Sequence, residues 1–132
     1  MNMEPTLKYI GVVNSPLKRI EDCPKLESEN APEATLTILP EFLEGVKDIK
    51  PGQRLILFTW LHIGDRTTIK VHPRDNPDTP LTGVFSTRSP DRPNPIGMHV
   101  VNVTAIEEPG LLKVSGLEVL DQTPLIDIKP AL

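Results

Sequence analysis

Residues 98–120 read MHVVNVTAIEEPGLLKVSGLEVL and carry the clearest fold signal in the chain. Two runs rich in branched apolar residues, 98–106 and 111–120, flank the sequence Glu107-Glu108-Pro109-Gly110. Branched residues favour strands, and a proline followed by glycine marks a turn. The stretch therefore predicts two strands with hairpin-like spacing.

The rest of the chain repeats this pattern of short strands and turns. RLILFTWLH (54–62) predicts a strand buried on both faces, with Trp60 in the core, and 67–71 is its expected hairpin partner. A short helix is expected between Pro40 and Pro51-Gly52. We treat the last twelve residues as a tail. Counting the other strand-type runs, we predict a mainly β fold, a single-sheeted antiparallel barrel of about seven strands and one short helix. Those runs are 7–13, 34–39 and 82–87.

Composition limits the class of protein. The 132 residues suit one domain spanning 1–132, and the 15 prolines, about twice the usual share of roughly 5%, disfavour a helix bundle. No long apolar run or signal peptide is present, so we expect a soluble cytoplasmic protein with no membrane partner. The single cysteine, Cys23, cannot form an internal disulfide.

The charge distribution gives no argument for nucleic acid. The net charge is −4, and residues 21–33 hold five acids and one lysine, which leaves 13 basic and 13 acidic residues elsewhere. Proteins that bind nucleic acid usually have a basic footprint. The sequence therefore permits a local basic patch and nothing stronger.

Several common chemistries have no motif here. The chain lacks G-x-G-x-x-G, the P-loop and G-x-S-x-G, so neither common phosphate-binding loop nor a serine hydrolase is indicated. The three histidines, His62, His72 and His99, are not at metal-ligand spacing. We predict no metal.

The segment GVFSTRSPDRPNPIG (83–97) is the strongest candidate for a site. Its three prolines stiffen the backbone without regular structure. Arg88 and Arg92 carry guanidinium forks that suit a carboxylate or phosphate, Asn94 offers a carboxamide, and Gly97 permits close backbone approach or an unusual φ. The alternative interpretation is a proline-stiffened barrel corner whose arginines pair with surface acids.

Several motifs together resemble the TrmO (YaeB-like, TsaA-like) family of tRNA (adenine37-N6)-methyltransferases, especially its short archaeal-type members. The resemblance covers nearly the whole chain in order. The matching segments are Ser15-Pro16-Leu17-Lys18, 40–45, Trp60-Leu61-His62 with Asp65-Arg66, 71–74, 83–97 and 121–130. It implies a single-sheeted β-barrel, usually a homodimer, that binds S-adenosylmethionine (SAM). The reaction implied is methyl transfer to N6 of N6-threonylcarbamoyladenosine at tRNA position 37.

The resemblance also implies cofactor contacts, carried over motif by motif. They are Pro24, Lys25, Leu26, His62, Ile63, Arg88, Met98, Asp121, Gln122, Thr123 and Pro124. The chain departs from the family, which prefers Pro-Arg-Gln at 24–26, Asp-Gly-Thr-Pro at 121–124 and tyrosine at Ala131. Gln122 enters a positive-φ turn less freely than glycine does. The extra C-terminal domain of longer bacterial members is also absent from this sequence.

Four side chains receive roles from these considerations. Asn94 is our candidate for orienting the adenine amine, by analogy with Asn-Pro turns of other adenine methyltransferases. Asp121 is the rival catalytic residue, or a turn cap. Arg88 is expected to hold the methionine carboxylate, and Arg92 an RNA phosphate or the substrate's threonyl carboxylate. Two other functions stay open: a methyltransferase of this fold acting on another RNA or a small molecule, and a non-catalytic SAM- or RNA-binding module.

Overall fold

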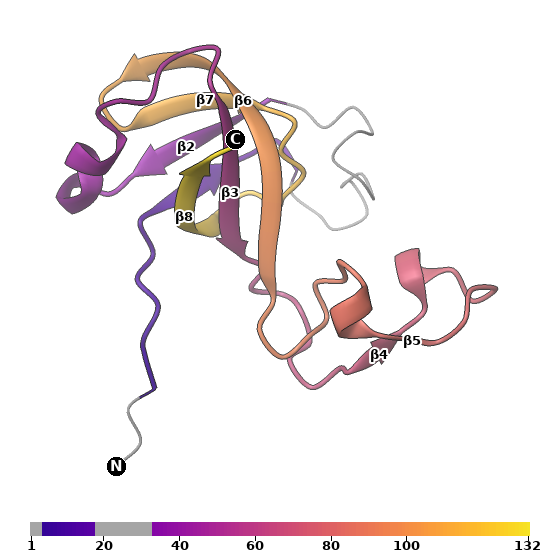
Figure 1. Cartoon of the computed structure of the whole chain (residues 1–132). Helices are drawn as coiled ribbons and strands as arrows, with labels where there is room; N and C mark the ends of the chain where they lie inside the picture. The colour runs from indigo at the N-terminus through magenta and orange to yellow at the C-terminus, as the bar shows by residue number, and fades with distance from the viewer. Residues whose placement is uncertain (1–3, 18–32) are drawn as a thin grey trace.

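Six strands form a closed antiparallel barrel in the computed structural model, which describes residues 4–17 and 33–132 (Figure 1). The order around the barrel is β1-β2-β7-β6-β3-β8. The predicted mainly β, antiparallel barrel is therefore confirmed. The barrel strands are β1 (Gly11–Asn14), β2 (Ala34–Ile38), β3 (Arg54–Trp60), β6 (Ile96–Glu108), β7 (Leu111–Ser115) and β8 (Thr123–Pro130).

Alternating side chains fill the barrel. Every second residue of β2 and β7 is buried, which is the period that a pleated strand with one buried face requires. Strand β3 follows the same rule: Leu55, Leu57 and Thr59 are buried. The expectation that β3 is buried on both faces is wrong, because its other face forms the outer wall of the barrel. Each fully buried leucine contributes about 1.5–3 kcal/mol through removal of apolar surface from water.

The tail is a barrel strand, which is a second correction. Residues Thr123–Pro130 form β8, which pairs with both β1 and β3 and so closes the barrel. Strand β7 is shorter than expected and ends at Ser115. Gly116 follows with a φ of 89°, a left-handed conformation that a continuing strand cannot adopt.

An arm of residues 61–95 leaves the barrel after β3 and returns at β6 (Figure 1). It contains β4 (Lys70–Val71) paired with β5 (Thr82–Gly83), and the 3₁₀ helices η3 (Pro73–Asp75) and η4 (Val84–Ser86). The predicted hairpin between 54–62 and 67–71 is therefore wrong. The predicted strand at 82–87 also stops at Gly83, where η4 takes over.

The short helix at Pro40 is a 3₁₀ helix, η2 (Pro40–Val46). Its Phe42, Leu43 and Val46 pack against the core. None of the helices in residues 4–17 and 33–132 has the length and apolar character needed to cross a membrane.

Candidate functional site

One end of the barrel collects most of the predicted site residues. Trp60 at the end of β3 pairs with Ile96 at the start of β6. Thr59 pairs with Leu125, and Val13 with Thr123, so the start of β8 lies at the same end. The residues that follow β3, those that precede β6 and those around the start of β8 are therefore neighbours around one rim. Those residues include His62, Ile63, Asn94, Asp121, Gln122, Thr123 and Pro124.

The turn before β8 is tied firmly to the end of β1. The backbone N–H of Ser15 donates to Asp121 Oδ1 at 2.9 Å, and the backbone N–H of Asp121 donates to the Leu17 carbonyl at 2.8 Å. The backbone N–H of Gln122 donates to the Val13 carbonyl at 2.7 Å. Asp121 thus holds two distant segments together, which supports the turn-capping interpretation. Its catalytic role stays a prediction.

Gln122 has a φ of 69°, in the left-handed region. The preference for glycine at this position in the resembled family implies such a positive φ. We predict that Gln122→Gly raises the free energy of unfolding by about 0.5–1 kcal/mol. Relief of the left-handed strain, about 1–2 kcal/mol, exceeds the added chain entropy of glycine. Thermal or urea unfolding measures the change. The matched control is Gln53→Gly, because Gln53 does not have a positive φ and its replacement should lower stability. An equal loss of stability in both variants would contradict the strain argument.

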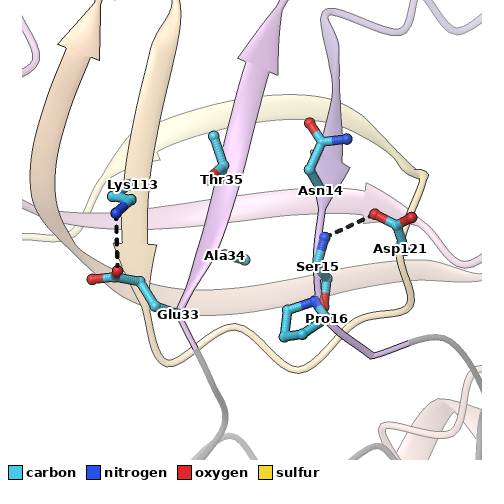
Figure 2. Close-up of a pocket in the computed structure, with 8 residues that line it drawn as sticks. All are labelled: Asn14, Ser15, Pro16, Glu33, Ala34, Thr35, Lys113 and Asp121. Atoms are coloured by element: carbon cyan, nitrogen blue, oxygen red, sulfur yellow. Dashed lines mark hydrogen bonds and ion pairs between the residues drawn. The ribbon is translucent and has the colours of Figure 1, made fainter.

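A pocket of about 530 Å³ opens beside this turn (Figure 2). Among the predicted site residues that the structure describes, only Asp121 lines it. Lys113 on its wall lies 3.7 Å from a Glu33 oxygen and 3.3 Å from a Glu107 oxygen, and the hydrogen bond from Lys113 to Glu107 raises the lysine pKa. The lining residues are Asn14, Ser15, Pro16, Glu33, Ala34, Thr35, Lys113 and Asp121. Three predicted cofactor contacts, Pro24, Lys25 and Leu26, lie outside the described residues.

The outer wall beside the rim is apolar. Met98 is 40% exposed and lies opposite Phe58 across the β3–β6 pair. Ile63 is 53% exposed, and His62 is exposed as well. These three predicted cofactor contacts therefore lie outside the barrel and not in its interior.

Gly97 lies beside Met98, but it faces inward. A Cβ at this position would lie 2.5 Å from Thr59 Oγ1 and 2.6 Å from His99 Nε2, so the predicted need for close approach is confirmed. His99 and Thr59 are themselves buried, and these two atoms are 2.8 Å apart.

The two arginines of the proline segment differ in their surroundings. Arg88 is exposed. Arg92 is half-buried, and its Nη2 donates to the carbonyls of Val84 and Thr87, the latter at 2.6 Å. Its Nε is buried without a hydrogen-bond partner among the described residues. Arg92 therefore holds the turn around η4, which supports the structural alternative for it. Its substrate role stays a prediction.

Asn94 is held by a residue to which the sequence assigned no role. Its Oδ1 accepts a hydrogen bond of 3.2 Å from Arg66 Nη2, while Arg66 Nε donates to the Pro93 carbonyl at 2.7 Å. The guanidinium of Arg66 also lies 5.1 Å from the centre of the Trp60 ring. Trp60 is half-buried and outside the core cluster, so its predicted core position is wrong. The sequence offered one signal for Arg66, its occurrence in the segment that resembles the family.

The residues that the structure describes form no candidate metal site. Across the part of the chain that the structure describes, no three His, Cys, Asp or Glu side chains are grouped closely enough to hold a metal ion.

A closed six-stranded antiparallel barrel with a proline-rich arm at one rim is the class of protein that these observations define. The tRNA-methyltransferase O N-terminal domain matches residues 12–132, and the chain belongs to this family. A Methanothermobacter thermautotrophicus protein named "Probable S-adenosyl-L-methionine-binding protein" is 38% identical over 129 residues, covering 98% of this chain and 91% of the relative. An Archaeoglobus fulgidus S-adenosyl-L-methionine-binding protein is 39% identical over 123 residues, covering 93% and 86%.

Solved structures agree with this membership. The crystal structure of TrmO from Pseudomonas aeruginosa superposes with a TM-score of 0.77 at 30% sequence identity. The superposition covers 100% of this chain and 56% of the TrmO chain, so the present chain spans little more than half of that protein.

Proposed function

We propose that this protein binds SAM and transfers its methyl group to N6 of N6-threonylcarbamoyladenosine at position 37 of tRNA. Family membership and relatives named as SAM-binding proteins support the cofactor. The observation that carries the proposal is the meeting, at one rim of the barrel, of the 121–124 turn, His62-Ile63 and the Asn94 loop. A cytoplasmic location and a single-domain organisation belong to the same proposal.

The side chains that the resemblance assigns to the cofactor suit the chemistry of SAM. The exposed guanidinium of Arg88 fits a carboxylate, and the Asp121 carboxylate fits an ammonium or sulfonium group. Ile63 and Met98 offer exposed apolar surface for an adenine ring. SAM supplies, when bound, a methyl group activated for in-line displacement, a step in which positioning contributes much of the catalysis.

Asn94 is the residue that we propose orients the nucleophile. In N6-threonylcarbamoyladenosine, N6 is a urea-type nitrogen with one hydrogen, and it is a weak nucleophile because its lone pair is conjugated into both the ring and the carbamoyl carbonyl. The carboxamide oxygen of Asn94 accepts a hydrogen bond from the N6–H and so orients the nitrogen, and the proton is lost to water as the methyl group is transferred. Asn94 is exposed, so a base splayed out from a single-stranded loop can reach it. Arg92 is proposed to assist substrate binding.

The test is methyl transfer from labelled SAM to bulk tRNA from a strain lacking this gene. We expect label in one modified nucleoside, and mass spectrometry should locate it at N6 of threonylcarbamoyladenosine at position 37. Label in a different nucleoside, or only in a small-molecule fraction, would indicate another substrate. If the protein binds SAM but transfers no label to any fraction, it is a non-catalytic binding module.

Arg88 gives a direct test of the cofactor site. Arg88→Ala is expected to weaken SAM binding by about 1.5–3 kcal/mol, the contribution of a hydrogen bond to a charged group, which is roughly 10- to 150-fold in Kd. Isothermal titration calorimetry measures the Kd for SAM in both proteins. The control is Arg54→Ala, an exposed arginine at the far end of β3, which should bind SAM as the parent does. Unchanged affinity in Arg88→Ala would exclude Arg88 from the site, and a parent without SAM affinity would refute the cofactor proposal.

A homodimer is the quaternary structure that we propose. The arm carries four strongly exposed apolar side chains, Ile63 (53%), Ile69 (63%), Leu81 (57%) and Phe85 (81%). The outer face of β6 is also apolar and exposed, at Ile96, Met98 and Val100. Exposed apolar side chains that gather into a patch mark an interaction site. A second copy of the chain would cover both sets of side chains, which include the proposed cofactor contacts Ile63 and Met98.

A further inference from the structure

Residues 61–66 and 90–95 are bonded together at the root of the arm. The Leu61 N–H donates to the Pro95 carbonyl at 2.7 Å, and the Asp65 N–H donates to Asp91 Oδ1 at 2.9 Å. Gly64 approaches the Pro90 carbonyl so closely that a Cβ would clash with it. The proline loop is therefore supported along its length by the segment that follows β3.

Arg66 lies at the centre of this contact and joins three groups. Its guanidinium lies over the Trp60 ring, and it donates to the Pro93 carbonyl and to the carboxamide of Asn94. Trp60 belongs to the barrel wall, whereas Pro93 and Asn94 belong to the part of the arm that leads back to β6. A guanidinium is planar and delocalised, so one side chain can stack through its face and donate in two directions along its edge. Lysine cannot reproduce this arrangement.

The contact also determines which way the Asn94 carboxamide points. Arginine has only donors, so the carboxamide atom that faces Arg66 must be the oxygen. A carbonyl oxygen has two lone pairs, and the bond from Arg66 uses one of them. We infer that Arg66 is a positioning residue for methyl transfer, because it fixes the orientation of the Asn94 carboxamide against the barrel wall. This inference rests on the proposed function.

The decisive experiment is a double-mutant cycle of Arg66→Lys and Asn94→Ala, read by single-turnover methylation of tRNA. Arg66→Lys alone should slow methyl transfer by about 10- to 100-fold, the scale of a small misplacement of a reacting group. In the Asn94→Ala background the same change should alter the rate by less than about twofold, because its effect passes through Asn94. The KM for tRNA and the Kd for SAM should stay close to parent values. Arg54→Lys is the matched control.

Two readouts do not depend on activity. Trp60 is the only tryptophan, so its emission should change in Arg66→Lys and not in Arg54→Lys. The side-chain NH₂ signals of Asn94, identified by their loss in Asn94→Ala, should shift or broaden in Arg66→Lys, while those of the exposed Asn102 stay unchanged.

Three results would overturn the inference. Unchanged Asn94 signals would show that Arg66 does not orient the carboxamide. Equal rate losses in both backgrounds would show that Arg66 acts independently of Asn94. A parent with no methyltransferase activity, but with the expected spectral changes, would refute the proposed reaction, and with it a positioning role in that reaction.

Discussion

Replacing Asn94 with alanine is expected to slow methyl transfer to tRNA by about 10²–10⁴-fold, the usual contribution of a positioned acid–base group. SAM affinity should stay unchanged, because Asn94 acts on the nucleophile and not on the cofactor. The free energy of unfolding should fall by only about 1 kcal/mol, since this exposed side chain accepts one hydrogen bond from Arg66 among the described residues. Single-turnover methylation measured beside the thermal midpoint checks both statements.

The structural alternative for Asn94 makes the opposite prediction. If Asn94 only stiffens a barrel corner, Asn94→Ala should lose stability and retain near-parent activity in the folded fraction. Asn102→Ala is a suitable control, because Asn102 is an exposed asparagine on β6 facing away from the core. A folded Asn94→Ala protein with the parent rate would make Asp121 the leading catalytic candidate.

Replacing Phe85 with aspartate is expected to convert the proposed dimer to a monomer at micromolar concentration. Phe85 is 81% exposed in the single chain, which is unusual for so large an apolar side chain. Aromatic anchors at interfaces commonly contribute 2 kcal/mol or more, so the dimer Kd should rise by about 30-fold or more. Analytical ultracentrifugation should give a species near the chain mass of 14.6 kDa, in place of twice that mass for the parent.

The control for Phe85 is Leu7→Asp. Leu7 is 47% exposed but lies near the N-terminus, outside the proposed interface, so this variant should stay dimeric. Phe85→Asp should keep the parent thermal stability as a monomer, because the exposed ring contributes little to the core. A parent that is monomeric at every concentration would refute the dimer, and an unchanged Kd in Phe85→Asp would remove the arm from the interface.

Local patterns in the sequence predict an antiparallel β-barrel and several of the turns between its strands. Alternation of apolar residues with period two specifies which face of a strand is buried, and this information is local. Close approach, one of the two reasons that the sequence suggests for glycine at position 97, is observed, and Gln122 has the positive φ that the resemblance implies. These are properties of one residue or one short segment.

Which segments lie next to one another follows from the closed barrel and not from any local pattern. Residues 123–130 were treated as a tail, although they close the barrel between β1 and β3, because two prolines obscured the strand pattern. The pairing of β4 with β5 was missed for a related reason: a strand's sequence specifies its faces but not its neighbour. The bonds at the site span still longer separations, 28 residues between Arg66 and Asn94 and 106 between Ser15 and Asp121. Contacts between residues so far apart depend on how the whole barrel closes, and no local pattern in the chain encodes them.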